Sequence, residues 1–246
     1  AFKDGKAYAS SYAGPVAINP KAPKGKVVEI DTTSLSIQRE VVVGYQPEEM
    51  EIVGNQLFVA NSGGYKAPDY DNTVSVIDLN TFTELKKINV AINLHHLKKD
   101  NYGDLYVTSR GDYYNVPSSL YLIDAATGTV KKNFNLSVSE MTIVNDKLYF
   151  YGNEFNYNTH SYKKSFGIID VKTEQIIANR IFDKEYEDAI KTPYGIAVNP
   201  ITEDIYMTDA RNYVSMGFVY CFDKNGHFKW KTEGGNIPAH FAFLYK

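Results

Sequence analysis

The sequence predicts an all-β protein, a β-propeller of four-stranded blades, on three observations. A strand-and-turn phrase recurs at a blade-sized spacing along the 246 residues. Segments rich in aromatic and β-branched residues precede its copies, and polar segments with alternating apolar residues follow them. No long helical pattern and no Pro/Ser-rich linker interrupts the chain. We therefore expect residues 1–246 to form a single propeller domain.

The recurring strand-and-turn motif is an apolar strand that ends in Asp and continues into a turn that contains Thr or Gly. Its Asp residues are Asp31, Asp78, Asp124, Asp170 and Asp223, which lie 47, 46, 46 and 53 residues apart. This period matches a propeller blade of about 40 to 50 residues. An Asp at a strand end accepts backbone N–H bonds in an Asx-turn. We therefore predict that these carboxylates stabilise turns and take no part in catalysis.

The flanking segments supply the other strands. Second strands are expected at 56–61, 104–108, 147–151 and 204–208, and outermost strands at 84–90 and 130–136. The C-terminal segment 237–245 resembles an innermost strand, whereas the N-terminus begins with a second strand at 6–10. We expect the two ends to join in one composite blade, which gives five blades and closes the sheet edges.

Composition and charge exclude several classes of function. The 26 Lys and Arg against 29 Asp and Glu give a net charge of −3 with no basic run, so nucleic acid is not an expected partner. The single Cys221 forbids an intrachain disulfide and a Cys-based zinc cluster. No stretch approaches the roughly 20 consecutive apolar residues of a membrane-spanning helix. The start at Ala1 indicates a processed or trimmed product.

Long connections between second and third strands are expected on one face, at 12–25, 64–72, 110–117, 153–162 and 210–215. Each carries Tyr, which combines a large apolar ring with a hydroxyl and is frequent in binding surfaces. The alternative is that these rings pack against their own loops. The ligand-binding residues predicted on this face are Tyr12, Tyr65, Tyr70, Arg110, Asp112, Tyr113, Tyr114, Phe155, Tyr157, Tyr162, Arg211 and Tyr213.

The segments that lead into the innermost strands form a second predicted set, nearer the axis. These channel-mouth residues are Gln46, Glu48, Glu49, His95, His96, Glu140, Tyr194 and His240. Imidazole and carboxylate groups together can bind a metal. However, successive ring positions are a blade apart, so only a narrow mouth would bring them together. A hydrated polar channel is the preferred interpretation, and we assign no metal ligands and no cofactor.

Catalytic motifs are not found in the sequence. It has no nucleophile elbow, no phosphate-binding glycine motif and no His-Glu-x-x-His helix. The segment 69–72 has some character of a calcium loop but lacks the spacing and the terminal Glu of an EF-hand. We therefore expect no enzymatic activity. A metal-dependent enzyme of lactonase or lyase type at the channel mouth is the less favoured alternative.

Several strings resemble the YncE-like propeller proteins on the surface of gut Bacteroidetes, many of which are labelled surface-layer proteins or carry a domain of unknown function. The resemblance rests on 45–49 (YQPEE), 59–65 (VANSGGY), 70–78 (YDNTVSVID), 109–114 (SRGDYY) and 194–200 (YGIAVNP), and extends over essentially the whole chain. Those relatives have seven blades, whereas five are countable here. Set against those relatives, either this ring is smaller or two N-terminal blades are missing from the chain as given.

This group is related to the BtuG lipoproteins, which capture cobalamin and pass it to an outer-membrane transporter. The resemblance implies an exported, non-enzymatic binding protein at the cell surface or in the periplasm, lipid-anchored through a preceding segment. Its ligand would be corrinoid-like or glycan-like and would bind the Tyr-rich loops. A scaffold that binds another protein of the cell envelope, such as an outer-membrane transporter, through the same face is the alternative.

Overall fold

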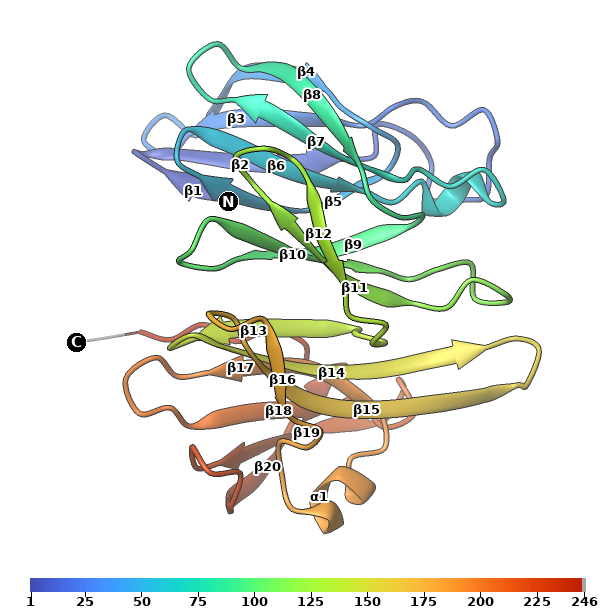
Figure 1. The fold of residues 1–246 in the computed structure, drawn as a ribbon, viewed down its shortest axis with the longest axis vertical. Helices are drawn as coiled ribbons and strands as arrows, with labels where there is room; N and C mark the ends of the chain where they lie inside the picture. Colours follow the sequence, from blue (N-terminus) through green and yellow to red (C-terminus); the bar gives the residue numbers. More distant parts are fainter. Residues whose placement is uncertain (245–246) are drawn as a thin grey trace. The chain divides into compact units, whose positions relative to one another are not determined.

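The computed structural model describes residues 1–244, which fold into five four-stranded antiparallel sheets (Figure 1). Each sheet consists of four consecutive strands paired in sequence order, the meander of a propeller blade. The predicted all-β propeller fold with five blades is therefore confirmed. The sequence pattern explains these strands, because apolar, aromatic and β-branched residues recur in second and third strands such as β6, β10 and β19.

The chain divides into two compact units, Ala1–Leu136 and the part that begins at Ser137. The first unit contains three blades. Their strands are β1 (Phe2–Lys3), β2 (Lys6–Ser11), β3 (Lys26–Asp31) and β4 (Ser36–Val42); β5 (Pro47–Val53), β6 (Gln56–Asn61), β7 (Thr73–Asp78) and β8 (Thr83–Asn89); and β9 (Leu94–Lys99), β10 (Asp104–Ser109), β11 (Ser119–Asp124) and β12 (Val130–Asn133). A 3₁₀-helix, η1 (Gly64–Lys66), lies between β6 and β7.

The second unit contains two blades and a short helix. Its elements are β13 (Glu140–Val144), β14 (Lys147–Asn156), β15 (Ser161–Asp170), β16 (Gln175–Ala178), α1 (Lys184–Ala189), β17 (Pro193–Val198), β18 (Ile205–Asp209), β19 (Met216–Phe222) and β20 (Phe228–Asn236). Helix α1 connects the outermost strand of one blade to the innermost strand of the next. Among residues 1–244, no helix is long and apolar enough to cross a membrane.

The core lies between neighbouring blades, where apolar side chains of adjacent sheets pack face to face. In the first unit, Leu57 and Ile77 pack with Val27 of the first blade, and Phe58 and Val76 pack with side chains of the third. The second unit has an aromatic core that includes Tyr149, Phe182 and Phe222. The rings of Phe182 and Phe222 stack with centroids 4.0 Å apart. Burial of these faces holds each blade against its neighbour.

Four of the repeated Asp residues end the third strand of their blades and Asp223 directly follows its strand; all five cap the following turn, as predicted. Asp124 Oδ1 accepts the Thr127 N–H at 2.8 Å and the Thr127 hydroxyl at 3.0 Å, and Asp170 repeats the arrangement with Thr173 at the same two distances. Corresponding bonds are made by Asp31, Asp78 and Asp223. The hydrogen bonds lower the pKa of all five carboxyls.

The predicted composite blade is wrong. The first sheet is completed by its own inner strand β1, whose Phe2 and Lys3 pair with Ala7 and Lys6 of β2. The segment 237–244 forms no strand. It lies against the second unit, where Pro238 O accepts the Thr208 hydroxyl at 2.6 Å. A tight turn lets residues 1–3 fold back onto the adjacent strand, and this local pairing takes the innermost position of the blade.

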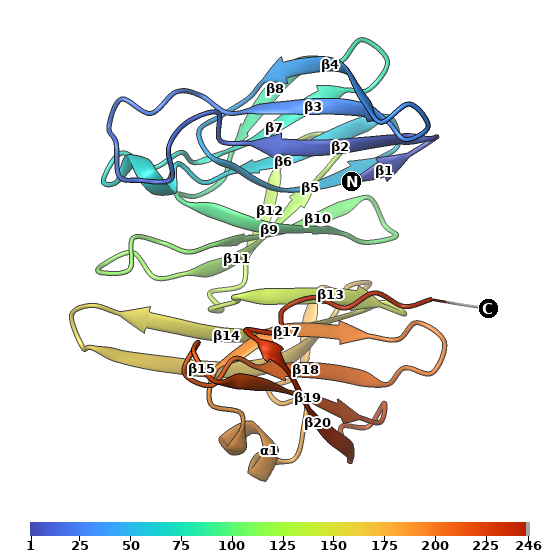
Figure 2. The ribbon, with the colours of Figure 1, turned by 180° about the vertical axis from the view of Figure 1, so that it is seen from behind.

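The predicted loop 153–162 is also wrong. Strand β14 continues to Asn156 and strand β15 begins at Ser161. The segment is therefore a long hairpin that extends beyond the other strands of its blade (Figures 1 and 2). Cross-strand pairing of Phe155 with Tyr162 and of Glu154 with Lys163 explains the extension. The Asn156 side chain caps the hairpin turn.

Candidate ligand-binding site

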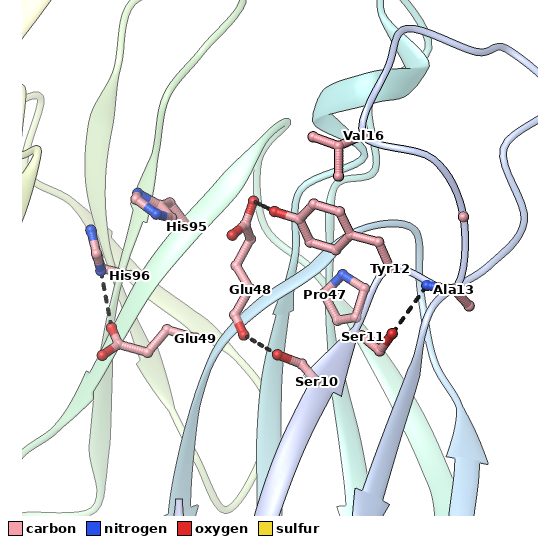
Figure 3. A pocket seen from close by; sticks show the side chains of 11 residues that line it. Ser10, Ser11, Tyr12, Ala13, Val16, Pro47, Glu48, Glu49, His95 and His96 are labelled. Carbon is pink, nitrogen blue, oxygen red and sulfur yellow. Dashed lines mark hydrogen bonds and ion pairs between the residues drawn. The ribbon is translucent and has the colours of Figure 1, made fainter.

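A cavity of about 670 Å³ opens in the first unit where β2, β5 and β9 come together (Figure 3). It lies at the end of β2 and at the starts of β5 and β9, the loop face of these three blades. Its lining residues are Ser10, Ser11, Tyr12, Ala13, Gly14, Val16, Pro47, Glu48, Glu49, His95 and His96. The site therefore unites one predicted loop tyrosine with four of the predicted channel-mouth residues.

Glu48 connects all three blades at this cavity. Its Oε1 accepts the Tyr12 hydroxyl at 3.0 Å and the Arg110 Nη1 at 3.2 Å (Figure 3 shows the first of these bonds). The Glu48 carbonyl also accepts the Ser10 hydroxyl at 3.1 Å. Burial raises the pKa of Tyr12, and the nearby Glu48 charge adds to the effect. Tyr12 therefore stays protonated and donates to the carboxylate.

Glu49 points to the other side of β5 and binds the third blade. Its Oε2 accepts the Leu97 N–H at 2.8 Å and contacts His96 Nδ1 at 3.2 Å, while Oε1 pairs with Lys98. Burial alone would raise the pKa of this carboxyl. The His96 hydrogen bond and the Lys98 charge outweigh burial and lower the pKa to about 2. Glu49 is thus a fixed anion with a full set of partners.

His95 lies between the two ion pairs, with its ring centroid 3.6 Å from that of His96. Burial strongly lowers the pKa of His95, and the neighbouring His96, Arg110 and Lys98 side chains lower it further. The ring is therefore neutral at physiological pH, with one nitrogen that donates and one that accepts. Among residues 1–244, no hydrogen bond to either ring nitrogen is found, so both are open to a ligand.

The loops around the cavity are held by tight backbone approaches. Gly63 and Gly111 occupy the same place in their loops, just after the second strand, and both have positive φ, 59° and 61°. A Cβ on Gly63 would lie 2.1 Å from Asp71 N, and one on Gly111 would lie 2.0 Å from Val116 O. Only glycine fits there. The second of these turns follows Arg110 and so helps to hold its guanidinium near Glu48.

The other predicted residues of the first unit surround the cavity without lining it. Tyr65 packs edge-on against Tyr12 with ring centroids 6.0 Å apart, and its carbonyl accepts the Asn19 N–H. Asp112 accepts three N–H groups of its own loop, so it is a turn residue. Tyr113 and Tyr114 are exposed at the tip of the same loop. Gln46 is buried in a left-handed backbone conformation, and Tyr70 lies near the 112–114 segment.

In the second unit, several of the predicted residues lie near one another, because Tyr213 interacts with Tyr162 and Tyr194, and the buried Tyr151 with Glu140, Tyr194 and Tyr213. The rings of Tyr157 and Tyr162 both pack on Phe155 at the end of the long hairpin. Tyr194 and Tyr213 meet edge-on. The Arg211 guanidinium lies over the ring of Phe218. The Glu140 carboxylate accepts a hydrogen bond from the Met141 N–H. His240 lies in the segment 237–244.

Several lining residues are not predicted by the repeat pattern, namely Ser10, Ser11, Val16 and Pro47. Serine, proline and a lone valine at a strand end are ordinary loop residues, so their types carry no signal. Lys98, the partner of Glu49, is missed for a similar reason, because it reads as an exposed position of an alternating strand. Among the described residues 1–244, no group of three or more His, Cys, Asp or Glu side chains is placed to hold a metal ion.

Comparison with known proteins finds similarity of fold only. No protein-family model matches the chain, and no curated protein matches it. Among solved structures, it is similar to hydrazine synthase of Kuenenia stuttgartiensis, with a TM-score of 0.64 and 16% sequence identity. That match covers 89% of this chain and 64% of the other, so the chain spans less than two thirds of its neighbour. At this identity the likeness supports the propeller fold and transfers no activity.

Proposed function

We propose that this chain is a non-enzymatic binding module of the cell surface or periplasm that captures a small molecule in the cavity formed by β2, β5 and β9. The main support for this proposal is that the opening of the cavity is held in place by the protein itself: Glu48 binds both Tyr12 and Arg110, which belong to neighbouring blades. Groups held before the ligand arrives lose little conformational entropy on binding. The corrinoid-like and glycan-like ligands suggested by the resemblance both present apolar surface beside polar edges, which suits this mixture of tyrosine and polar groups.

The hydrogen bonds of the cavity favour binding over catalysis. The Ser10 hydroxyl donates to the Glu48 carbonyl, and the Ser11 hydroxyl accepts the Ala13 N–H. Both hydroxyls are therefore engaged with backbone and not with the neutral His95. A serine nucleophile needs a base within hydrogen-bond reach. The cavity residues are thus arranged as fixed ligand contacts.

Titration of the isotope-labelled protein with cyanocobalamin and with neutral oligosaccharides tests this proposal by NMR. We expect chemical-shift changes at Tyr12 and His95 for at least one probe. We also expect a loss of affinity of about fivefold or more in Tyr12→Ala, since a buried aromatic contact contributes about 1 kcal/mol or more. Tyr157→Ala, on the hairpin of the second unit, is the matched control and leaves the affinity unchanged. Absence of any shift at the cavity at millimolar probe concentration would contradict the proposal.

Exposed side chains at the loop tips favour a second candidate, a scaffold for a protein of the cell envelope. Tyr114 and Val116 of the first unit are 50% and 46% exposed, and aromatic residues are enriched in protein interfaces. Binding of a purified outer-membrane transporter, lost in the double variant Tyr113→Ala/Tyr114→Ala and kept in Tyr12→Ala, would support this function. Binding that depends on Tyr12 alone would support the first.

A further inference from the structure

We infer that the cavity of the first unit selects an uncharged ligand whose hydroxyl or carboxamide groups donate hydrogen bonds, and that it rejects the same molecule when it carries an ionised carboxylate. This inference rests on the proposed function, since it assumes that the cavity binds a small molecule. It adds the chemical class of that molecule and names Glu48 and His95 as the groups that select it.

The charges around the cavity already balance within the protein. Glu48 pairs with Arg110 at 3.2 Å, and Glu49 pairs with Lys98. The side chain of Glu48 is 14% exposed and that of Arg110 31%, so the first pair is largely withdrawn from water. His95, which lies beside both pairs, is neutral at physiological pH. A ligand therefore meets no unbalanced charge that would compensate the loss of its own hydration.

The open polar atoms of the cavity point to a donor on the ligand. The hydrogen bonds that the Glu48 carboxylate accepts within residues 1–244 both go to Oε1. Its other oxygen, Oε2, accepts no hydrogen bond from residues 1–244 and lies on the side of His95 in the view of Figure 3. A carboxylate oxygen only accepts hydrogen bonds. A hydroxyl or an amide N–H of the ligand can therefore bind Oε2, and the neutral His95 can donate to or accept from a neighbouring group.

A charged ligand makes an unfavourable contact in this cavity whether it is an anion or a cation. An ionised carboxylate would lie near Oε2 of Glu48, and like charges brought together out of water repel strongly. A cationic group would compete with Arg110 for Glu48 and would lie near the Lys98 and Arg110 charges. Neutral hydroxyl and carboxamide groups avoid both costs. Sugars carry the first kind of group and the corrin ring carries the second, so this chemistry has two possible sources.

The experiment compares two matched pairs of probes with the full chain, by calorimetry and by NMR. One pair is lactose and sialyllactose; the other is cyanocobalamin and its derivative in which one propionamide is hydrolysed to the acid. We expect the neutral member of one pair to bind at least about tenfold more tightly than the acid, a difference that one like-charge contact readily supplies. The pair that binds identifies the source of the ligand.

The variant Glu48→Gln tests the residue that makes the selection. The variant keeps the size of the side chain and an acceptor oxygen but removes its charge. Because the like-charge contact is then gone, we expect the affinities for the neutral and the acidic probe to differ by no more than about threefold. Glu233→Gln, on the exposed strand β20 of the second unit, is the matched control and keeps the wild-type preference. A melting curve for each variant confirms that it folds.

Each outcome is decisive. If the acid binds as tightly as the neutral probe, with shifts at Tyr12 and His95, the inference fails and the proposed function stands. If Glu48→Gln folds and keeps the full preference for the neutral probe, Glu48 is not the selecting group and the inference fails in that part. If no probe of either pair shifts the resonances of Tyr12 and His95, both the inference and the proposed function fail. The comparison of the wild-type probe pairs does not depend on any variant.

Discussion

The carboxylates of the turns and those of the cavity mouth differ in where their partners come from. Asp124 and Asp170 accept hydrogen bonds from residues three positions ahead. Glu48 is bound by Tyr12, 36 residues before it, and by Arg110, 62 residues after it. The turn residues belong to one blade and the cavity residues join three. The same chemical group thus stabilises a local turn in one region and assembles a distant site in the other.

Glu49→Gln gives the largest expected effect and tests whether the cavity carboxylates stabilise the fold as well as the site. The pKa of Glu49 is about 2 in the folded protein, below the ordinary value of 4.5. We expect Glu49→Gln to lower the free energy of unfolding at neutral pH by about 2–3 kcal/mol. A shift of one pKa unit corresponds to about 1.4 kcal/mol, and the value is reduced because the Glu49 side chain is 29% exposed to solvent. Urea unfolding of both proteins measures it.

The same pair of proteins makes a prediction about pH. Because the pKa of Glu49 is lower in the folded state than in the unfolded state, its contribution is present above about 4.5 and is lost as the pH falls towards 2. The difference in unfolding free energy between wild type and Glu49→Gln should therefore shrink over that interval. A difference that stays constant from pH 7 to pH 3 would show that the lost stability is not electrostatic.

Gly111→Ala gives the next largest effect and acts on the cavity through backbone geometry. The new Cβ would lie 2.0 Å from Val116 O at a residue with φ of 61°, so we expect about 2 kcal/mol of destabilisation, within the range for a strained backbone position. The loop 110–117 must then shift and weaken the contact of Arg110 with Glu48. Gly235→Ala, where no atom lies within 4 Å of the added carbon, is the control. Equal melting temperatures for Gly111→Ala and Gly235→Ala would contradict the expected destabilisation at Gly111.

Asp124→Ala gives the smallest effect, because the turn is exposed and its bonds are local. We expect a slight decrease in melting temperature, well below that of Glu49→Gln, and no change in ligand affinity. The effect should also vanish at acidic pH: the Thr127 N–H and hydroxyl lower the pKa of Asp124, so its contribution is present above the ordinary Asp value and is lost as the pH falls through the lowered one. A change in affinity would show that the turns and the cavity are coupled.

The repeat pattern was sufficient for most of the fold but for only part of the site. The strands, the blades and the Asp turns depend on residues close in sequence, so alternation and the 46-residue spacing predict them. The hairpin of β14 and β15 was not predicted because Asn and Glu disfavour strands, whereas cross-strand pairing of Phe155 with Tyr162 overrides that preference. The inner strand β1 was missed because two residues are too short for a periodic signal.

Sequence alone determined that Glu48, Glu49, His95 and His96 lie at the loop ends of inner strands, because their place in the repeat specifies it. Tertiary structure decided that these residues and Tyr12 line one cavity, that Arg110 and Lys98 balance their charges, and that His95 is neutral. The reason is physical. A repeat specifies the position of a residue within its own blade, whereas pairing, burial and pKa depend on side chains that the packing of neighbouring blades brings within a few ångströms.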